Sequence, residues 1–200
     1  HSFLTRPLPL TWFQSTPSEV AELASMSMEL ISMEHWHVFF DNKEVLRRAK
    51  IRQLEKTLGS LPMIAKIDKF QHWLYTNPNH TREERQTQWE KLSAEFSVGL
   101  IDISGYEHYF SMDWQRVLHI YEVPFYYIEY AIAQLGAIAM WRQYKQNPEQ
   151  ALSNYIDALK LGYTRPIGEI YETAGISFDF SKKYVKELGE FLMAELEQLY

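Results

Sequence analysis

Apolar residues recur along most of this sequence at the three- and four-residue spacing of helices that pack on a core. The clearest case is a helix predicted over the last twenty residues, where Val185, Leu188, Leu192 and Leu199 lie near one face. Strand signals are sparse, because no Asn-Gly or Asp-Gly turn separates alternating apolar runs, and residues 98–103 are the one candidate strand. The pattern predicts an all-α fold.

Capping residues indicate where these helices begin. Thr16 precedes Pro17 and lies three residues before Glu19, which predicts a long helix over residues 17 to about 40. Three more helix starts are predicted at Asp41, Thr81 and Asn147, and a fourth at Ser181. Predicted helix ends fall at Gly59, Gly99 and Gly162, with a separate segment from Pro62 to Tyr75.

Composition narrows the class of protein. The 200 residues contain 46% hydrophobic residues and no repeat or linker, so we expect one helical unit over residues 1–200. The net charge of −6 argues against binding to nucleic acid or to an anionic membrane. With no cysteine and no signal-peptide pattern, we expect a cytoplasmic protein whose metal ligands, if any, are His, Asp or Glu.

Two acidic residues are unusual in the first predicted helix. Residues 20–31 are apolar or small on every side, which is typical of a helix that is buried all round. Glu22 and Glu29 are seven residues apart, so they share one face of this helix. A buried carboxylate without a partner costs several kcal/mol, so each acid needs a cation, a metal or hydrogen-bond donors, or else it must stay protonated. The alternative is that this face meets solvent.

The residues around these acids resemble a known family. The sequence Ala21-Glu22-Leu23-Ala24-Ser25, with Glu29 seven residues after Glu22, resembles the segment that supplies the third zinc ligand in the oligoendopeptidase F and thimet oligopeptidase family of zinc metallopeptidases. The resemblance implies one zinc ion (Zn²⁺), with Glu22 as a ligand and Glu29 as a supporting acid behind it. In that family the other two ligands are the histidines of a His-Glu-x-x-His helix.

That zinc motif is absent from this chain. No two of the seven histidines are four residues apart with a glutamate after the first. The opening His1-Ser2-Phe3 resembles the sequence that follows the zinc helix in the family. We therefore expect this chain to be the C-terminal portion of a metallopeptidase catalytic domain, and to be inactive without the zinc helix.

A segment rich in tyrosine carries a second resemblance. Four tyrosines fall within residues 121–130, shortly after His119, and the segment resembles the family's conserved His and Tyr segment, which faces the zinc across the cleft. The resemblance implies that His119, Tyr126 and Tyr130 stabilise the oxyanion that forms when a peptide carbonyl is attacked. A helix opened by Pro124 places Tyr126 and Tyr130 on one face.

The choice of tyrosine stays open. One branch of the family has a glycine-rich stretch after the histidine, and residues 120–123 contain no glycine. Tyr121 and Tyr127 are therefore alternatives to Tyr126 and Tyr130 as the oxyanion donor.

These observations predict a zinc-dependent endopeptidase that hydrolyses short peptides. Its partners are the peptide substrate and the missing N-terminal part of the same enzyme. Two alternatives remain: a non-catalytic helical binding module with the same fold, and one half of a split peptidase whose zinc helix is on another chain.

Overall fold

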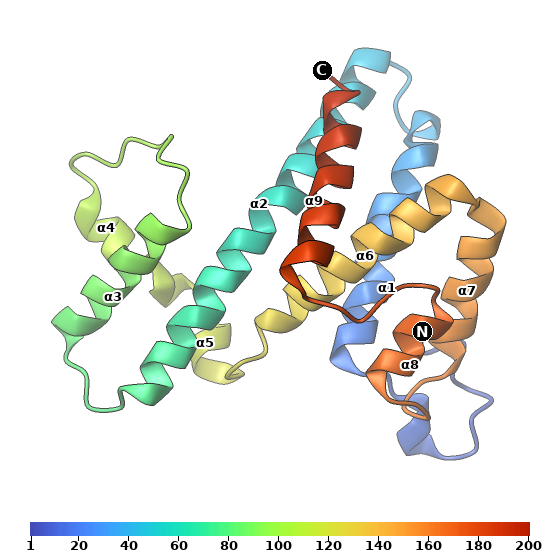
Figure 1. The fold of residues 1–200 in the computed structure, drawn as a ribbon, viewed down its shortest axis with the longest axis horizontal. Helices are drawn as coiled ribbons and strands as arrows, with labels where there is room; N and C mark the ends of the chain where they lie inside the picture. The colour runs from blue at the N-terminus through green and yellow to red at the C-terminus, as the bar shows by residue number, and fades with distance from the viewer. The chain divides into compact units, whose positions relative to one another are not determined.

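The protein is built from helices. The computed structural model describes all of residues 1–200, and none of them lies in a β-strand. The predicted all-α fold is confirmed, and residues 98–103 form a loop. None of the helices combines the length and the apolar character that a membrane span requires. The nine α-helices of Figure 1 are α1 (Ser18–Ser32), α2 (Lys43–Thr76), α3 (Arg82–Glu95), α4 (Glu107–Ser111), α5 (His119–Glu122), α6 (Ile128–Gln146), α7 (Pro148–Lys160), α8 (Ile167–Thr173) and α9 (Lys182–Glu197), and the short 3-10 helices are η1 (Thr11–Gln14), η2 (Met33–Val38) and η3 (Asp113–Arg116).

Three of the predicted helix starts lie where the capping residues placed them. Thr81 and Glu84 form a capping box, in which each side chain accepts the backbone N–H of the other residue. The side-chain oxygens of Asn147 and Ser181 accept backbone N–H groups in the first turns of α7 and α9. Because a cap satisfies backbone donors within a few residues of itself, local sequence is enough to predict it.

Two helix starts differ from the prediction by a residue or two. α1 begins at Ser18, and Pro17 occupies the cap position in an extended conformation with no side-chain hydrogen bond, so Thr16 is not the cap. At the start of α2 the acceptor is Asn42, whose Oδ1 accepts from the Glu44 N–H at 2.8 Å, and not Asp41. In both places neighbouring residues compete for one cap position.

α2 is longer than predicted. It continues through Gly59 and Pro62 to Thr76, so Gly59 does not end a helix and Pro62 does not begin one. A glycine costs about 1 kcal/mol in a helix interior and a proline about 3 kcal/mol. Ile64, Ile67 and Phe70 are buried just beyond the proline. Burial of each such side chain contributes about 1.5–3 kcal/mol, which is enough to offset both local penalties.

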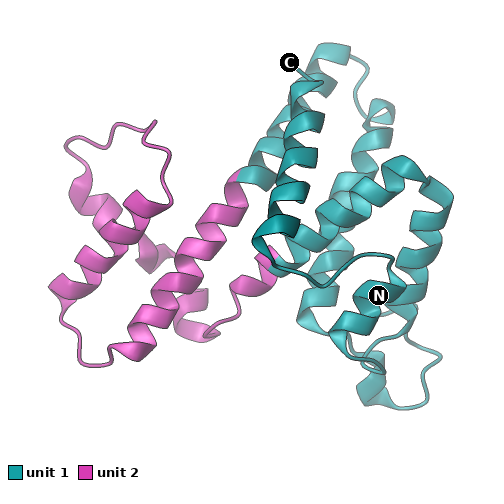
Figure 2. Ribbon diagram, in the orientation of Figure 1, with its two compact units in different colours: residues 1–58, 132–200 teal, residues 59–131 magenta.

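The chain divides into two compact units. Unit 1 comprises residues 1–58 and 132–200, and unit 2 comprises residues 59–131 (Figure 2). In unit 1, α1 contacts α7 and α8. A Cβ atom at Gly136 of α6 would lie 2.8 Å from Leu23 Cδ1, so α6 approaches α1 this closely because position 136 has no side chain. The assignment of residues 1–200 to one domain stays a prediction.

Aromatic rings form the core of unit 2. Phe70 on α2 contacts Trp89 on α3 with ring centroids 5.0 Å apart, and Trp114 on η3 at 5.6 Å. Ile120 of α5 is buried in the same cluster. The neighbouring His119 is half-buried, so the core holds α5 and leaves this histidine at its edge.

Residues near the N-terminus pack against the turn between α7 and α8. The Phe13 carbonyl accepts from the Tyr163 N–H at 3.0 Å, and the Trp12 and Tyr163 ring centroids are 6.4 Å apart. Gly162 has φ +51°, and a Cβ atom there would lie 2.1 Å from the Phe13 carbonyl oxygen. This turn therefore requires glycine for its backbone conformation and for space.

Gly162→Ala is expected to destabilise the protein by about 2–4 kcal/mol, because alanine is disfavoured at positive φ and its methyl group clashes with Phe13. Denaturant unfolding of the purified protein measures the change. Gly168→Ala is the matched control, since nothing lies within 4 Å of its added Cβ atom. Gly168 is in helix α8, so alanine there is expected to change stability by at most about 1 kcal/mol, in the stabilising direction. Equal effects of the two substitutions would contradict the close approach at Gly162.

Candidate active site

The two acidic residues of the first predicted helix lie on α1, in unit 1. Glu22 is half-buried and Glu29 is exposed. Gln53 Nε2 donates a hydrogen bond to Glu29 Oε2 at 3.0 Å. The buried side of α1 is a single stripe, so the prediction that this helix is buried all round is wrong. The stripe consists of Val20, Leu23, Ala24, Ser27, Leu30 and Ile31.

The spacing of that stripe explains the difference. Each member lies three or four residues from another member, at positions 20, 23, 24, 27, 30 and 31, and this spacing buries one face of a helix and leaves the other open. The small residues Ala21 and Ser25 made the open face look apolar in the sequence, although neither is buried. Of the two acids, Glu22 is the more covered, and Glu29 keeps access to water.

The histidine and three of the tyrosines come together in unit 2. His119 Nε2 and the Tyr130 hydroxyl are 3.1 Å apart and share a hydrogen bond. The His119 ring centroid lies 5.0 Å from that of Tyr127, 5.6 Å from Tyr130 and 6.1 Å from Tyr126. The rings of Tyr126 and Tyr130 are 5.6 Å apart. We call His119, Tyr126, Tyr127 and Tyr130 the His–Tyr cluster.

The backbone that builds this cluster differs from the prediction. Pro124 does not open a helix, because α6 begins at Ile128 and residues 123–127 form a turn. Phe125 has φ +62° and is the one non-glycine residue of the chain with a positive φ. Tyr126 and Tyr130 are therefore close without lying on one helical face. Proline restricts its own φ and favours a turn as well as a first helical residue, so sequence alone could not separate the two outcomes.

Tyr127 is a neutral hydrogen-bond donor within the cluster. Burial raises the pKa of the Tyr127 phenol above its usual value, and the nearby Tyr130 acts in the same direction. Tyr127 therefore keeps its proton at neutral pH. Tyr121 lies apart, with its ring stacked against Trp114 at 5.8 Å. Phenol and imidazole donors can stabilise a developing negative charge on an oxygen atom that comes within about 3 Å of them.

Contacts from α2 hold the turn before Tyr126. Gln71, which is fully buried, accepts the Phe125 N–H through its side-chain Oε1 at 2.9 Å. The Phe125 ring lies between two rings of α2, with centroid distances of 4.9 Å to His72 and 5.0 Å to Tyr75. No role was predicted for Gln71, because a single glutamine 48 to 59 residues before the members of the cluster carries no local signal.

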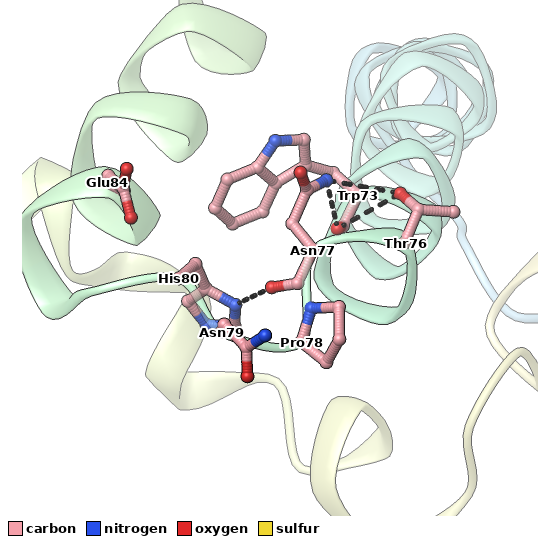
Figure 3. Close-up of a pocket in the computed structure, with 7 residues that line it drawn as sticks. All are labelled: Trp73, Thr76, Asn77, Pro78, Asn79, His80 and Glu84. Carbon is pink, nitrogen blue, oxygen red and sulfur yellow. Dashed lines mark hydrogen bonds between the residues drawn. The ribbon is translucent and has the colours of Figure 1, made fainter.

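A pocket of about 350 Å³ lies elsewhere in unit 2 (Figure 3). It is lined by Trp73 and Thr76 at the end of α2, by the loop residues 77–80, and by Glu84 of α3. None of the residues predicted to act in catalysis or metal binding lines it, so we do not assign this pocket to the active site.

The described residues contain no group of three or more histidine, aspartate and glutamate side chains placed to hold a metal ion. A protein zinc site needs at least three such ligands. No such set of ligands surrounds Glu22 among the residues that the structure describes.

Comparisons with known proteins identify the family of this chain. The family model for Peptidase family M3 matches residues 1–190. The chain belongs to Peptidase family M3. A search of curated proteins gives no match.

Solved structures of peptidases share the fold. The chain is 28% identical to the structure described as PZ peptidase A with inhibitor 2, with a TM-score of 0.89. It is also 28% identical to a putative oligoendopeptidase F, again with a TM-score of 0.89, and 25% identical to a putative oligoendopeptidase F from Bacillus anthracis str. Ames, with a TM-score of 0.79. Each match covers 98% of this chain, but only 35%, 34% and 32% of the three structures in that order. The chain thus spans about a third of their length.

Proposed function

We propose that residues 1–200 are the C-terminal portion of the catalytic domain of a cytoplasmic zinc endopeptidase that hydrolyses short peptides. The observation that carries the proposal is the His–Tyr cluster, in which one histidine and three tyrosines converge within a chain that matches Peptidase family M3. A family match alone fits a chain without activity, whereas four hydrogen-bonding rings at one place fit a reaction that develops charge on oxygen.

The role of the cluster is to stabilise the tetrahedral oxyanion of a peptide bond under attack. His119 and Tyr130 share a hydrogen bond, and when His119 Nε2–H donates to the Tyr130 oxygen, the phenol O–H stays available to donate to the substrate oxygen. Tyr126 packs against both rings and adds a second phenol at the same place. Donors that are held in position before the reaction are effective because they need no reorganisation as charge develops.

In this proposal, Glu22 is one of the zinc ligands. A carboxylate is one of the donor types that zinc accepts, and Glu22 is the more covered of the two acids on α1. The two histidine ligands and the general-base glutamate would come from a His-Glu-x-x-His helix outside this chain, in the missing N-terminal part of the same enzyme. When bound, zinc would supply a Lewis acid to the reaction. Glu29 would support Glu22 from the same helix, two turns away.

The experiment tests the intact protein that contains this chain. We expect it to cleave short fluorogenic peptides, to contain about one zinc ion per chain, and to lose activity on dialysis against a chelator and recover it with added zinc. The coding sequence immediately upstream should encode a His-Glu-x-x-His motif. A full-length protein that lacks both the motif and the activity would favour the non-catalytic binding module, and co-purification with a separate chain that carries the motif would favour the split peptidase.

A further inference from the structure

We infer that Gln71 is a positioning residue for the active site: it holds Phe125 in its left-handed backbone conformation and thereby sets the position of Tyr126 in the His–Tyr cluster. The inference rests on the proposed function for its catalytic consequence. Its structural part stands on the hydrogen bond between Gln71 Oε1 and the Phe125 N–H, at 2.9 Å.

Phe125 has a strained backbone conformation. A bulky residue at φ +62° is rare, because its Cβ atom crowds the backbone, and such a conformation persists only where surrounding contacts impose it. The turn brings Tyr126 next to His119, with ring centroids 6.1 Å apart. Local strain of this kind concentrates at functional sites, where it sets the direction of a catalytic side chain.

Gln71 is a polar side chain in a fully buried position. Its side chain is fully buried on α2, and its Nε2 group has no hydrogen-bond partner. The orientation of the amide is settled by the bond itself, since a backbone N–H can donate only to the oxygen. A buried amide with one unsatisfied end is unfavourable compared with an apolar side chain of similar size. The oxygen of Gln71 is therefore useful mainly because it accepts from Phe125.

Helix α2 also contacts the side chain of Phe125. The Phe125 ring packs against His72 and Tyr75, the one next to Gln71 and the other one helical turn further along. Residues 71, 72 and 75 lie within five positions of one helix, so α2 contacts both the backbone and the ring of Phe125. The turn continues into α6 through the hydrogen bond from the Glu129 N–H to the Tyr126 carbonyl, at 2.9 Å.

The test compares the intact, zinc-loaded protein with its Gln71→Met variant, in which a side chain of similar length lacks the acceptor oxygen. We expect faster hydrogen exchange at the Phe125 amide and a kcat about 10-fold to 100-fold lower, with the zinc content unchanged and KM altered much less than kcat. Ser111→Ala is the matched control, because Ser111 is also buried in unit 2 and its hydroxyl bonds to the His108 carbonyl, away from the turn. The control is expected to leave kcat and the exchange of the Phe125 amide as in the parent.

A double-mutant cycle separates positioning from general stability. If Gln71 acts through Tyr126, Gln71→Met should lower kcat little further in a Tyr126→Phe background. Gln71→Glu, whose fully buried carboxyl group is expected to stay protonated and to keep a carbonyl acceptor, should restore most of the turnover and the protection of the amide. Unchanged exchange at Phe125 in Gln71→Met, or the same fold-loss of kcat with and without the Tyr126 hydroxyl, overturns the inference. An inactive parent refutes the proposed function instead, and the exchange measurement then decides alone whether Gln71 holds the turn.

Discussion

Glu22→Gln in the intact protein is expected to remove zinc and lower peptidase activity by at least about 10³-fold, because a neutral amide replaces an anionic ligand and the loss of a metal centre removes several kcal/mol of transition-state stabilisation. Zinc content by elemental analysis and kcat/KM on a short peptide measure the two effects. The half-buried position of Glu22 on α1 suits a side chain that meets another group on its open face.

Glu29→Gln is the matched control for this prediction, since it makes the same chemical change on the same helix, two turns away. Glu29 is exposed and its partner is Gln53, so we expect the variant to keep stoichiometric zinc and to lose at most about tenfold in activity. Full activity together with stoichiometric zinc in Glu22→Gln would falsify the ligand assignment. Zinc loss in Glu29→Gln alone would move the assignment to Glu29.

The second large effect is expected at the His–Tyr cluster. His119→Ala should keep zinc and lower kcat by about 10²-fold to 10³-fold, because one oxyanion donor is lost while the metal ligands are untouched. Tyr130→Phe removes the hydroxyl that shares a hydrogen bond with His119 Nε2, and we expect a loss of the same order. Steady-state kinetics on a short peptide and zinc analysis check both variants.

Single hydroxyl deletions decide which tyrosine is the second donor. Tyr126→Phe is expected to lower turnover strongly, and Tyr127→Phe weakly, with the fold intact in both. Tyr121→Phe is the control from the same segment, because its ring stacks on Trp114 at 5.8 Å, apart from the cluster. A large loss in Tyr127→Phe or in Tyr121→Phe, with Tyr126→Phe unaffected, would transfer the donor role to that residue. Equal activity in all of the tyrosine variants and in His119→Ala would remove the cluster from the mechanism.

Features that depend on neighbours along the chain were predictable. The all-α class and the caps at Thr81, Asn147 and Ser181 rest on interactions within one helical turn, so the local sequence contains all of their causes. Glycine and proline were less reliable as signals of where a helix ends or begins. Gly59 and Pro62 carry local penalties that predict a break in α2, and the burial of Ile64, Ile67 and Phe70 against other parts of the fold outweighs those penalties.

The candidate site was also only partly predictable from the sequence. The sequence selected His119, Tyr126 and Tyr130 by resemblance, and the structure brings their rings together. The roles of these residues and of Glu22 stay predictions. The turn that brings the tyrosines together was not predictable, because Phe125, in its left-handed conformation, contacts residues of α2 that lie at least 50 positions earlier in the chain.

The amino-acid sequence by itself determined the helical class, the helix starts at Thr81, Asn147 and Ser181 and the residue types available for chemistry, since hydrophobic spacing, caps and side-chain functional groups are local properties. Only the tertiary structure decided that α1 is buried on one face, that α2 is continuous, and that Gln71 reaches the turn before Tyr126. These outcomes depend on which distant surfaces meet. Burial of a single large side chain stabilises a fold by about 1.5–3 kcal/mol, which exceeds most local preferences of the backbone.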